Sequence, residues 1–264
     1  AEVAIVADAR AALEDLLAAI EDLVPARDYR ELRYFQEIQD AKRRWEELAA
    51  PLVTSDDSPM TMQRVVRELR AVLDRSAIVT TGAGLPQAVV RQHFPVYEPR
   101  THITSGGFSS MGFTVPAAIG AKLAHPDRQV VGVAGDGDFL QTIQELALAA
   151  IEDVAAVFLV MNNQGWISIR NGQRAFVSGE LGVYFDRRGE PYSPNFAQVA
   201  RDFGLHGERV EHPEEVGPAI RRALASGGPA VVEAIIAREG PGSGLIKTGW
   251  WDAPVPAYLG ERRA

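Results

Sequence analysis

The residues best suited to chemistry are an aspartate between two glycines, Gly135-Asp136-Gly137, and a pair of asparagines, Asn162-Asn163. Asp136 precedes Asn163 by 27 positions (163 − 136), and an amphipathic helix followed by an apolar strand at 154–161 is predicted between them. Both motifs are therefore expected at the carboxyl ends of strands in one α/β sheet. A carboxylate oxygen, an amide oxygen and a carbonyl oxygen of the turn after Asn163 suit Mg²⁺, which prefers oxygen ligands.

The same turn is suited to a diphosphate. The two glycines beside Asp136 allow backbone N–H groups to approach phosphate oxygens, and a helix predicted to open near Asp138 adds the positive end of its dipole. The sequence therefore predicts a joint site for magnesium and a diphosphate at the mouth of the sheet.

Together, the two motifs resemble the thiamine-diphosphate motif of the acetolactate-synthase/benzoylformate-decarboxylase superfamily. A lone Gly-Asp-Gly occurs in many turns, so the resemblance depends on the double asparagine at this spacing. A second segment, residues 105–113 (SGGFSSMGF) followed by 114–123 (TVPAAIGAKL), resembles the aminopyrimidine-binding turn of that family and its small-residue helix. The resemblance implies that Met111 wedges under the cofactor and that the Ser109 carbonyl accepts its 4′-amino group. By itself, Met111 also suits a core position beside a Gly-rich turn.

The turn Gly82-Ala83-Gly84 follows a predicted strand and could pass for a dinucleotide-binding loop. Position 87 is Gln, so the third glycine of that motif is missing and we reject this interpretation. In the thiamine family, the equivalent turn contacts the diphosphate through its backbone.

The resemblance assigns residues to each part of the site. Its metal ligands would be Asp136, Asn163 and the carbonyl of Gly165. Its cofactor-binding residues would be Gly82, Ala83, Gly84, Ser109, Ser110, Met111, Gly135, Gly137, Asp138, Phe139, Asn163, Gly165 and Trp166.

Catalytic residues are harder to assign from this chain, and His102 and Trp166 are the candidates. His102 suits either a substrate-facing position or an ordinary strand end. Pyruvate-decarboxylase-like members carry an acid six residues after the second asparagine, and here that position is Ile169, which puts simple aldehyde release by that route in doubt. Trp166 and Ile169 suit either an apolar substrate wall or packing against the following helix.

Composition excludes several classes of protein. The chain has 264 residues, 46% hydrophobic and 23% charged, which suits one large α/β domain with appendages. A net charge of −8 without a basic cluster argues against nucleic acid as a partner, and the lack of an 18-residue apolar run argues against a membrane span. Without cysteine there is no disulfide, thiolate metal site or cysteine nucleophile. We expect a cytoplasmic protein.

Strands and helices alternate along most of the chain, which predicts an α/β fold with a mostly parallel sheet and helices on both faces. The predicted strands are 1–8, 77–81, 129–134, 156–161 and 230–236. The predicted helices are 9–23, 26–48 (stopped by Pro51), 60–73, 86–93, 115–123, 139–151, 196–203 and 213–225.

Three regions are expected. Residues 1–57 resemble the tail of the family's middle domain plus a linker helix, and 58–239 the pyrophosphate-binding domain. Residues 240–264 form a Gly- and Pro-rich tail, either a lid over the cofactor anchored by Trp250 and Trp251 or an arm on a neighbouring subunit.

The family's pyrimidine-binding domain, which supplies a catalytic glutamate, has no counterpart in this sequence. The resemblance therefore implies a cofactor-anchoring subunit or fragment of a lyase or transferase that makes or breaks C–C bonds beside a carbonyl, as a 2-oxo-acid decarboxylase or carboligase. It would act on a small carbonyl substrate, together with a separate chain carrying the pyrimidine-binding and middle domains, in at least a heterotetramer. One alternative is a hydrolase of cyclic 1,2-diones, because the Trp-Trp-Asp-x-Pro-Val run and residues 108–113 (FSSMGF) also resemble such enzymes of this superfamily. Another is a non-catalytic assembly subunit, although intact Asp136 and Asn163 argue against it.

Overall fold

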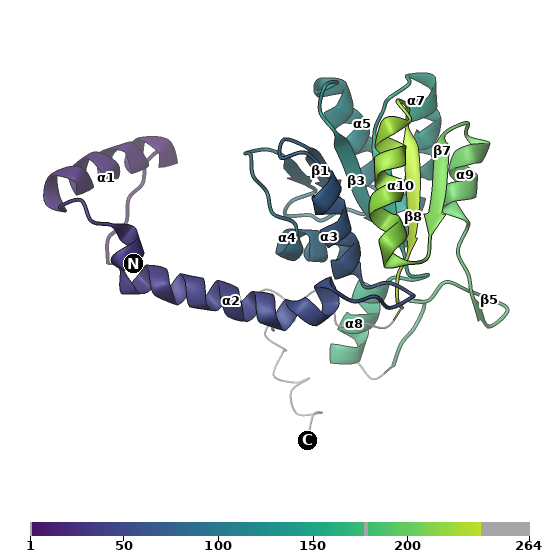
Figure 1. Ribbon diagram of the computed structural model, residues 1–264, viewed down its shortest axis with the longest axis horizontal. Helices are drawn as coiled ribbons and strands as arrows, with labels where there is room; N and C mark the ends of the chain where they lie inside the picture. Colours follow the sequence, from purple (N-terminus) through teal and green to yellow (C-terminus); the bar gives the residue numbers. More distant parts are fainter. Residues whose placement is uncertain (1, 177–178, 239–264) are drawn as a thin grey trace. The chain divides into compact units, whose positions relative to one another are not determined.

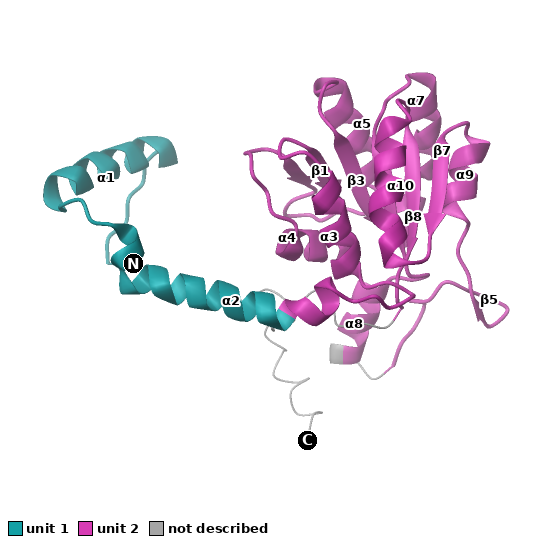
Figure 2. Ribbon diagram, in the orientation of Figure 1, with its two compact units in different colours: residues 1–48 teal, residues 49–264 magenta. Residues whose placement is uncertain are grey.

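The computed structural model describes residues 2–176 and 179–238 (Figure 1). The chain divides into two compact units, Ala1–Leu48 and Ala49–Ala264 (Figure 2). No helix among the described residues is both long and apolar enough to cross a membrane.

The first unit holds helix α1 (Ala9–Leu23), the short 3-10 helix η1 (Tyr29–Glu31) and most of α2 (Arg33–Val53). The predicted helix at 9–23 is confirmed, and it begins where the Asp8 carboxylate accepts the N–H groups of Arg10 and Ala11. The apolar residues on which that prediction depended all remain exposed: Leu13, Leu16, Leu17, Ile20 and Leu23.

Three predictions for this region are wrong. Residues 2–8 form no strand, because a strand needs a paired neighbour and no described segment of the chain pairs with them. The long helix begins at Arg33 rather than at residue 26, since Asp28 caps η1 instead. Pro51 lies inside the last turn of α2, where its missing N–H removes only one hydrogen bond, so it does not stop the helix.

The second unit contains a six-stranded sheet in which all strands are parallel, as predicted for this α/β fold (Figure 1). The order across the sheet is β2 (His102–Thr104), β1 (Ile78–Thr81), β3 (Val130–Gly135), β4 (Val157–Asn162), β8 (Ala230–Ile235) and β7 (His206–Val210).

Helices cover both faces of this sheet. One face packs against α3 (Met62–Val72), α4 (Leu85–His93) and α10 (Pro213–Ala225), and the other against α5 (Thr114–Ala124), α7 (Leu146–Ile151) and α9 (Phe196–Asp202). Along β4, Val157, Leu159 and Met161 join the first core, whereas Phe158 and Val160 join the second. This alternation places apolar residues on both sides, which explains why the central strands are continuously hydrophobic.

The predicted helix at 139–151 is wrong as one element. It divides into α6 (Asp136–Leu140), the 3-10 helix η2 (Ile143–Glu145) and α7, and it opens at Asp136 rather than near Asp138. Thr142 leaves the helical region (φ −138°), and its hydroxyl donates to the carbonyl of Gly112. A tertiary hydrogen bond therefore replaces helix continuity at this point.

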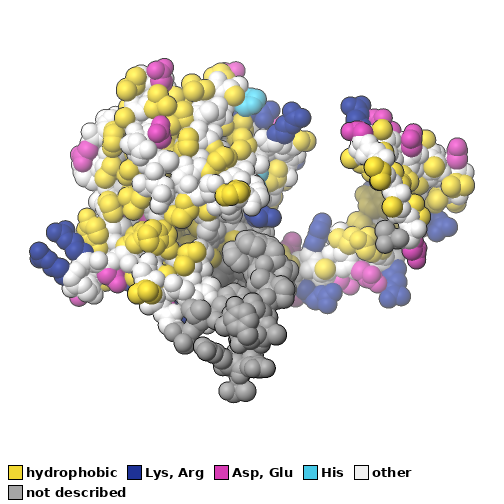
Figure 3. Space-filling view, turned by 180° about the vertical axis from the view of Figure 1, so that it is seen from behind, with side chains coloured by type: hydrophobic (Ala, Val, Ile, Leu, Met, Phe, Trp, Pro, Cys, Tyr) yellow, Lys and Arg dark blue, Asp and Glu magenta, His cyan; other side chains and the backbone are white. Residues whose placement is uncertain are grey.

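No bounds were predicted for the edge strands β2 and β7, for helix α8 (Ile167–Phe176), or for the small hairpin of β5 (Asp186–Arg187) and β6 (Glu190–Pro191). A helix near Trp166 and a strand end at His102 were predicted only as alternatives for those residues. Hydrophobic side chains are scattered over the second unit in Figure 3, and the most exposed large ones include Phe108 and Leu181.

A fully buried carboxylate, Glu233 on β8, joins the sheet to the turn after β4. One of its oxygens accepts the Asn162 amide at 2.8 Å and the other accepts the backbone N–H of Ala197 at 3.2 Å. The Arg209 guanidinium lies 3.5 Å away as a charged partner. Asn162 in turn accepts the N–H of Gln164, so this network orients the turn that follows the double asparagine.

We predict that Glu233→Ala lowers the free energy of unfolding by about 1–3 kcal/mol, because it leaves the buried Asn162 amide and the buried Ala197 N–H without their acceptor. Urea denaturation followed by circular dichroism measures the change. The exposed Glu152→Ala is the control and should stay within about 0.5 kcal/mol of the unsubstituted chain. Equal effects of the two substitutions would show that the Glu233 network carries no stability.

Candidate functional site

Three turns meet at the carboxyl edge of the sheet, after the neighbouring strands β1, β3 and β4. They contain residues 82–84, 135–138 and 162–165. Gly135 of β3 pairs with Met161 of β4, so Asp136 begins its turn directly beside the double asparagine. After β1, the chain forms β2 on one side of β1 and then returns to form β3 on the other side of β1. This change of direction is a switch point, the place where open parallel sheets bind ligands.

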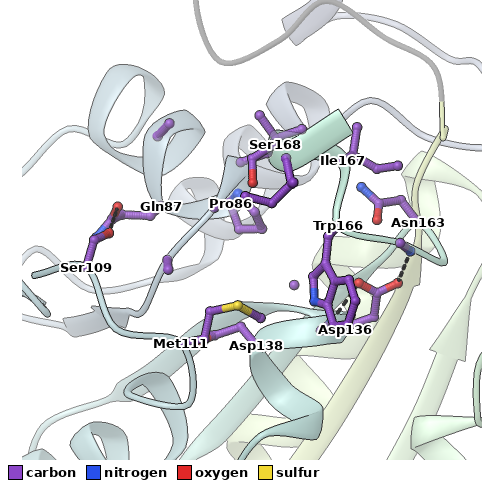
Figure 4. A pocket seen from close by; sticks show the side chains of 18 of the residues that line it. Pro86, Gln87, Ser109, Met111, Asp136, Asp138, Asn163, Trp166, Ile167 and Ser168 are labelled. Carbon is purple, nitrogen blue, oxygen red and sulfur yellow. Dashed lines mark hydrogen bonds between the residues drawn. The ribbon is translucent and has the colours of Figure 1, made fainter. Parts of the chain in front are cut away.

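A cavity of about 600 Å³ lies at this point and is lined from all three turns. Figure 4 shows Asp136, Asn163 and Trp166 on one side of it and Gln87 with Ser109 on the opposite side. Met111 and Asp138 lie between these two groups (Figure 4). The segments predicted to hold the two ends of a cofactor therefore face one space.

Asp136 is a buried carboxylate at the end of β3 that lines the cavity. Its two oxygens accept separate backbone N–H groups, from Gly137 at 2.8 Å and from Gly165 at 3.1 Å. Burial raises the pKa of Asp136 to about 6, although these and neighbouring backbone N–H groups favour the ionised form. A cation at the remaining lone pairs would reverse this shift, so the donor set fits a divalent metal ion.

The turn after β4, the strand that pairs with β3, carries the other two candidate oxygen donors. They are the side-chain amide of Asn163 and the backbone carbonyl of Gly165. Asn163 is buried and lies on the same side of the cavity as Asp136 in Figure 4, and the Gly165 backbone pairs with Tyr184. Arg238 donates to the carbonyls of Gln164 at 2.9 Å and Phe185 at 3.1 Å. The shape of the turn is therefore fixed from outside the cavity.

Among the described residues, no group of three or more His, Asp or Glu side chains is arranged to hold a metal ion. The site above differs from such clusters because it combines one carboxylate with an amide and a backbone carbonyl. That set of hard oxygen donors fits Mg²⁺, which keeps further positions for phosphate oxygens.

Trp166 packs over the turn that begins with Asp136. A Cβ added to Gly137 would collide with the indole Nε1, so only glycine allows this approach. The indole also makes an edge-to-face contact with Phe185, with 4.9 Å between ring centroids. Trp166 thus lines the cavity in a position fixed by Gly137 and Phe185. Its contact with a substrate stays a prediction.

Asp138 connects the turn after β3 to the Met111 segment. Its carboxylate accepts the N–H of Gly112 at 2.7 Å and the hydroxyl of Thr114. Burial raises the pKa of Asp138, and these two hydrogen bonds oppose the rise. The same carboxylate occupies the space beside Gly82, where an added Cβ would lie 2.5 Å from Oδ1.

Most predicted site residues line the cavity, including Ala83, Gly84, Ser109, Met111 and Gly165. The structure does not bring four of them to its lining: Gly82, Ser110, Phe139 and His102.

Two of these four have clear structural positions. The Phe139 side chain is a core residue in contact with Phe196, so only its backbone is near the site. His102 lies 3.1 Å from the Thr81 hydroxyl, and burial, with the charge of Arg91, lowers its pKa. Its place on β2 matches the strand-end alternative.

Sequence reasoning missed the contribution of two helices. The start of α4 and the start of α8 supply lining residues, among them Leu85, Pro86, Gln87, Ile167 and Ser168. The sequence did contain a signal for α4. Proline is common in the first turn of a helix, so Pro86 indicates that a helix begins directly after Gly84, with its N-terminus at the turn that lines the cavity.

The chain matches a family model described as "Thiamine pyrophosphate enzyme, C-terminal TPP binding domain" over residues 60–234. It is 31% identical over 245 residues to a probable acetolactate synthase large subunit of Methanocaldococcus jannaschii, covering 89% of this chain and 39% of that protein. It is 33% identical over 230 residues to the acetolactate synthase isozyme 1 large subunit of Escherichia coli (87% and 39%). Identity to the mitochondrial acetolactate synthase catalytic subunit of Aspergillus candidus is 34% over 193 residues (72% and 27%).

The chain therefore belongs to the thiamine pyrophosphate enzymes and contains their C-terminal TPP-binding domain. It is similar to acetolactate synthase large subunits, in agreement with the resemblance that the sequence motifs indicated. It spans about two fifths of the length of the first two relatives.

We predict that Gly82→Ala destabilises the protein by roughly 1–3 kcal/mol, because the new methyl group collides with the Asp138 carboxylate. In an Asp138→Ala background, the same substitution should cost much less, since the space is then free. Urea denaturation of the two single variants and the double variant measures this coupling. Additive effects would contradict the packing of Asp138 against Gly82.

Proposed function

We propose that this chain is the cofactor-anchoring part of an enzyme that uses thiamine diphosphate and Mg²⁺ to make or break C–C bonds beside a carbonyl. The observation that carries the proposal is the buried Asp136 carboxylate beside Asn163 and the Gly165 turn, within one cavity with Met111. In this account Asp136, Asn163 and the Gly165 carbonyl hold the metal ion.

The diphosphate would lie between the turns that follow β1 and β3. Helix α4 begins directly after Gly84, and its first N–H groups provide favourable dipoles for an anion. The backbone around Gly137 and Asp138 lines the same cavity from the other side. A metal ion on Asp136 would neutralise further phosphate charge, which supports joint binding.

When bound, thiamine diphosphate supplies an electron sink for a carbanion next to a former carbonyl carbon. The contribution of this chain is to bind and orient. The Ser109 carbonyl would accept the 4′-amino group of the cofactor, and Met111 would support its two rings. Trp166 and Ile169 line the cavity as apolar groups, and they would help to exclude water from the reacting carbon once a partner surface covers them.

The substrate class we propose is a small 2-oxo acid, acted on by decarboxylation or carboligation. Similarity to acetolactate synthase large subunits supports this choice. The hydrolase alternative depends on residues 108–113 together with the run that begins at Trp250. That run lies outside the described residues, as does the predicted lid or arm. The retained oxygen donors of the metal site favour an active enzyme over a non-catalytic assembly subunit.

We also propose that the pyrimidine-binding and middle domains come from a separate chain, or from other segments of a longer polypeptide. The chain covers only 39% of its first relatives, which supports this view. The cavity mouth supports it too, because Met111, Trp166 and Ile169 are 40%, 38% and 57% exposed and would be covered by a partner surface. A cytoplasmic hetero-oligomer remains our prediction.

We predict that Asp136→Ala abolishes Mg²⁺-dependent retention of thiamine diphosphate, because it removes the one charged metal ligand. Cofactor content after gel filtration in Mg²⁺ buffer is the measurement, and thermal unfolding verifies that the variant is folded. The exposed Asp127→Ala serves as a control and should retain the cofactor at the level of the unsubstituted chain. Undiminished cofactor in Asp136→Ala would rule out the metal assignment.

We further predict that this chain alone converts 2-oxo acids no faster than free thiamine diphosphate does, because half of the cofactor site is absent. Adding a polypeptide with the pyrimidine-binding and middle domains should restore turnover and saturate at one to one. Turnover of a 2-oxo-acid panel, with the mass in solution, tests this and should reveal at least a heterotetramer. Robust activity from a monomer of this chain would contradict the proposed division of the site.

A further inference from the structure

We propose that Gln87 is a positioning residue that sets the distance between the two turns facing opposite ends of the cofactor. This inference rests on the function proposed above. Through Gln87, the chain would be organised to recognise the thiamine portion of the cofactor, and not only its diphosphate.

Gln87 lies in the first turn of α4 and is buried. Its Nε2 donates to the carbonyl of Gly82 at 2.6 Å and lies 2.6 Å from the Thr104 hydroxyl. Its Oε1 accepts the hydroxyl of Ser109 at 2.9 Å. One side chain therefore connects the turn after β1, the end of β2 and the turn that leads to Met111.

Other residues also hold the Gly82 turn and the Met111 turn, which Gln87 connects. Their contacts show which part of each turn depends on Gln87. The Ser105 hydroxyl also donates to the Gly82 carbonyl at 2.9 Å. At the far end of the Met111 turn, Asp138 holds the N–H of Gly112 and Thr142 holds its carbonyl. The contact from Gln87 to Ser109 holds the beginning of that turn.

Ser109 is the place where such support matters. Its φ of 52° lies in the left-handed region, which is unfavourable for a non-glycine residue and persists only when the surroundings impose it. The Ser109 carbonyl is the group proposed to accept the 4′-amino group, and Met111 follows two residues later. A shift of Ser109 would therefore displace both contacts with the thiamine portion.

A purely structural role for Gln87 makes a different prediction from a positioning role. If Gln87 only stabilised the turn at Gly82, its loss would weaken binding of any diphosphate. If it positions Ser109, its loss should weaken binding of thiamine diphosphate while sparing inorganic diphosphate. Both ligands are therefore compared in Mg²⁺ by isothermal titration, without reference to turnover.

The test uses Gln87→Met, which keeps the side-chain length without the amide, and Ser109→Ala, which removes only the hydroxyl. We expect each to weaken the affinity for thiamine diphosphate about tenfold or more, with the affinity for inorganic diphosphate changed less than about twofold. The double variant should be little weaker than Gln87→Met, because both substitutions remove the same hydrogen bond.

Gln129→Met is the matched control. Gln129 also joins two segments, because its side chain accepts the N–H of Asp74 at 2.8 Å. It directly precedes β3, so it lies at the amino-terminal end of that strand, away from the site at the carboxyl end. Its substitution should leave both affinities unchanged. Should Gln87→Met fail to fold, Ser109→Ala still decides the question.

Equal losses for the two ligands in Ser109→Ala, or no loss for either, would overturn the inference while leaving the proposed function intact. If the unsubstituted chain binds neither ligand in Mg²⁺, the proposed function fails, and this inference fails with it. The two failures are thus distinguished by the unsubstituted chain.

Discussion

The site depends on one buried carboxylate, that of Asp136, held at the end of a central strand by backbone N–H groups from two turns. Because burial disfavours its charge, the surrounding structure must supply compensating polar contacts. The Gly165 turn does so directly, and that turn is itself kept in place by Arg238 on one side and by the Asn162–Glu233 contact on the other. Charged residues outside the cavity thus fix the geometry inside it.

Much of the fold was predictable because its central elements carry strong local signals. The apolar runs of β3 and β4 and helix α10, with Pro213 at its start, were found within a residue or two. The bounds of the edge strands β2 and β7 were not predicted, because these strands are short, half-buried and partly polar, and pair on one side only. The break at Thr142 was also invisible, because it depends on a hydrogen bond to Gly112, far away in the sequence.

The candidate site was likewise predictable only in part. Glycine-flanked Asp136 and the double asparagine could be found from residue types and spacing, and the sheet register then brings them together. Gln87 gave no such signal, because its importance comes from three partners on separate segments. Phe139 misled for the opposite reason: it adjoins the motif, but α6 turns its side chain into the core. Contacts between distant segments decide these roles, and the sequence alone does not contain them.

The most direct test of the central claim is a crystal structure of this chain grown with thiamine diphosphate and Mn²⁺, with the metal located by its anomalous signal. The account predicts one strong peak about 2.1 Å from an oxygen of Asp136, the Asn163 amide oxygen and the Gly165 carbonyl, with phosphate oxygens completing the coordination. Cofactor bound in the cavity with no metal at these three oxygens, or with the metal held elsewhere, would contradict it.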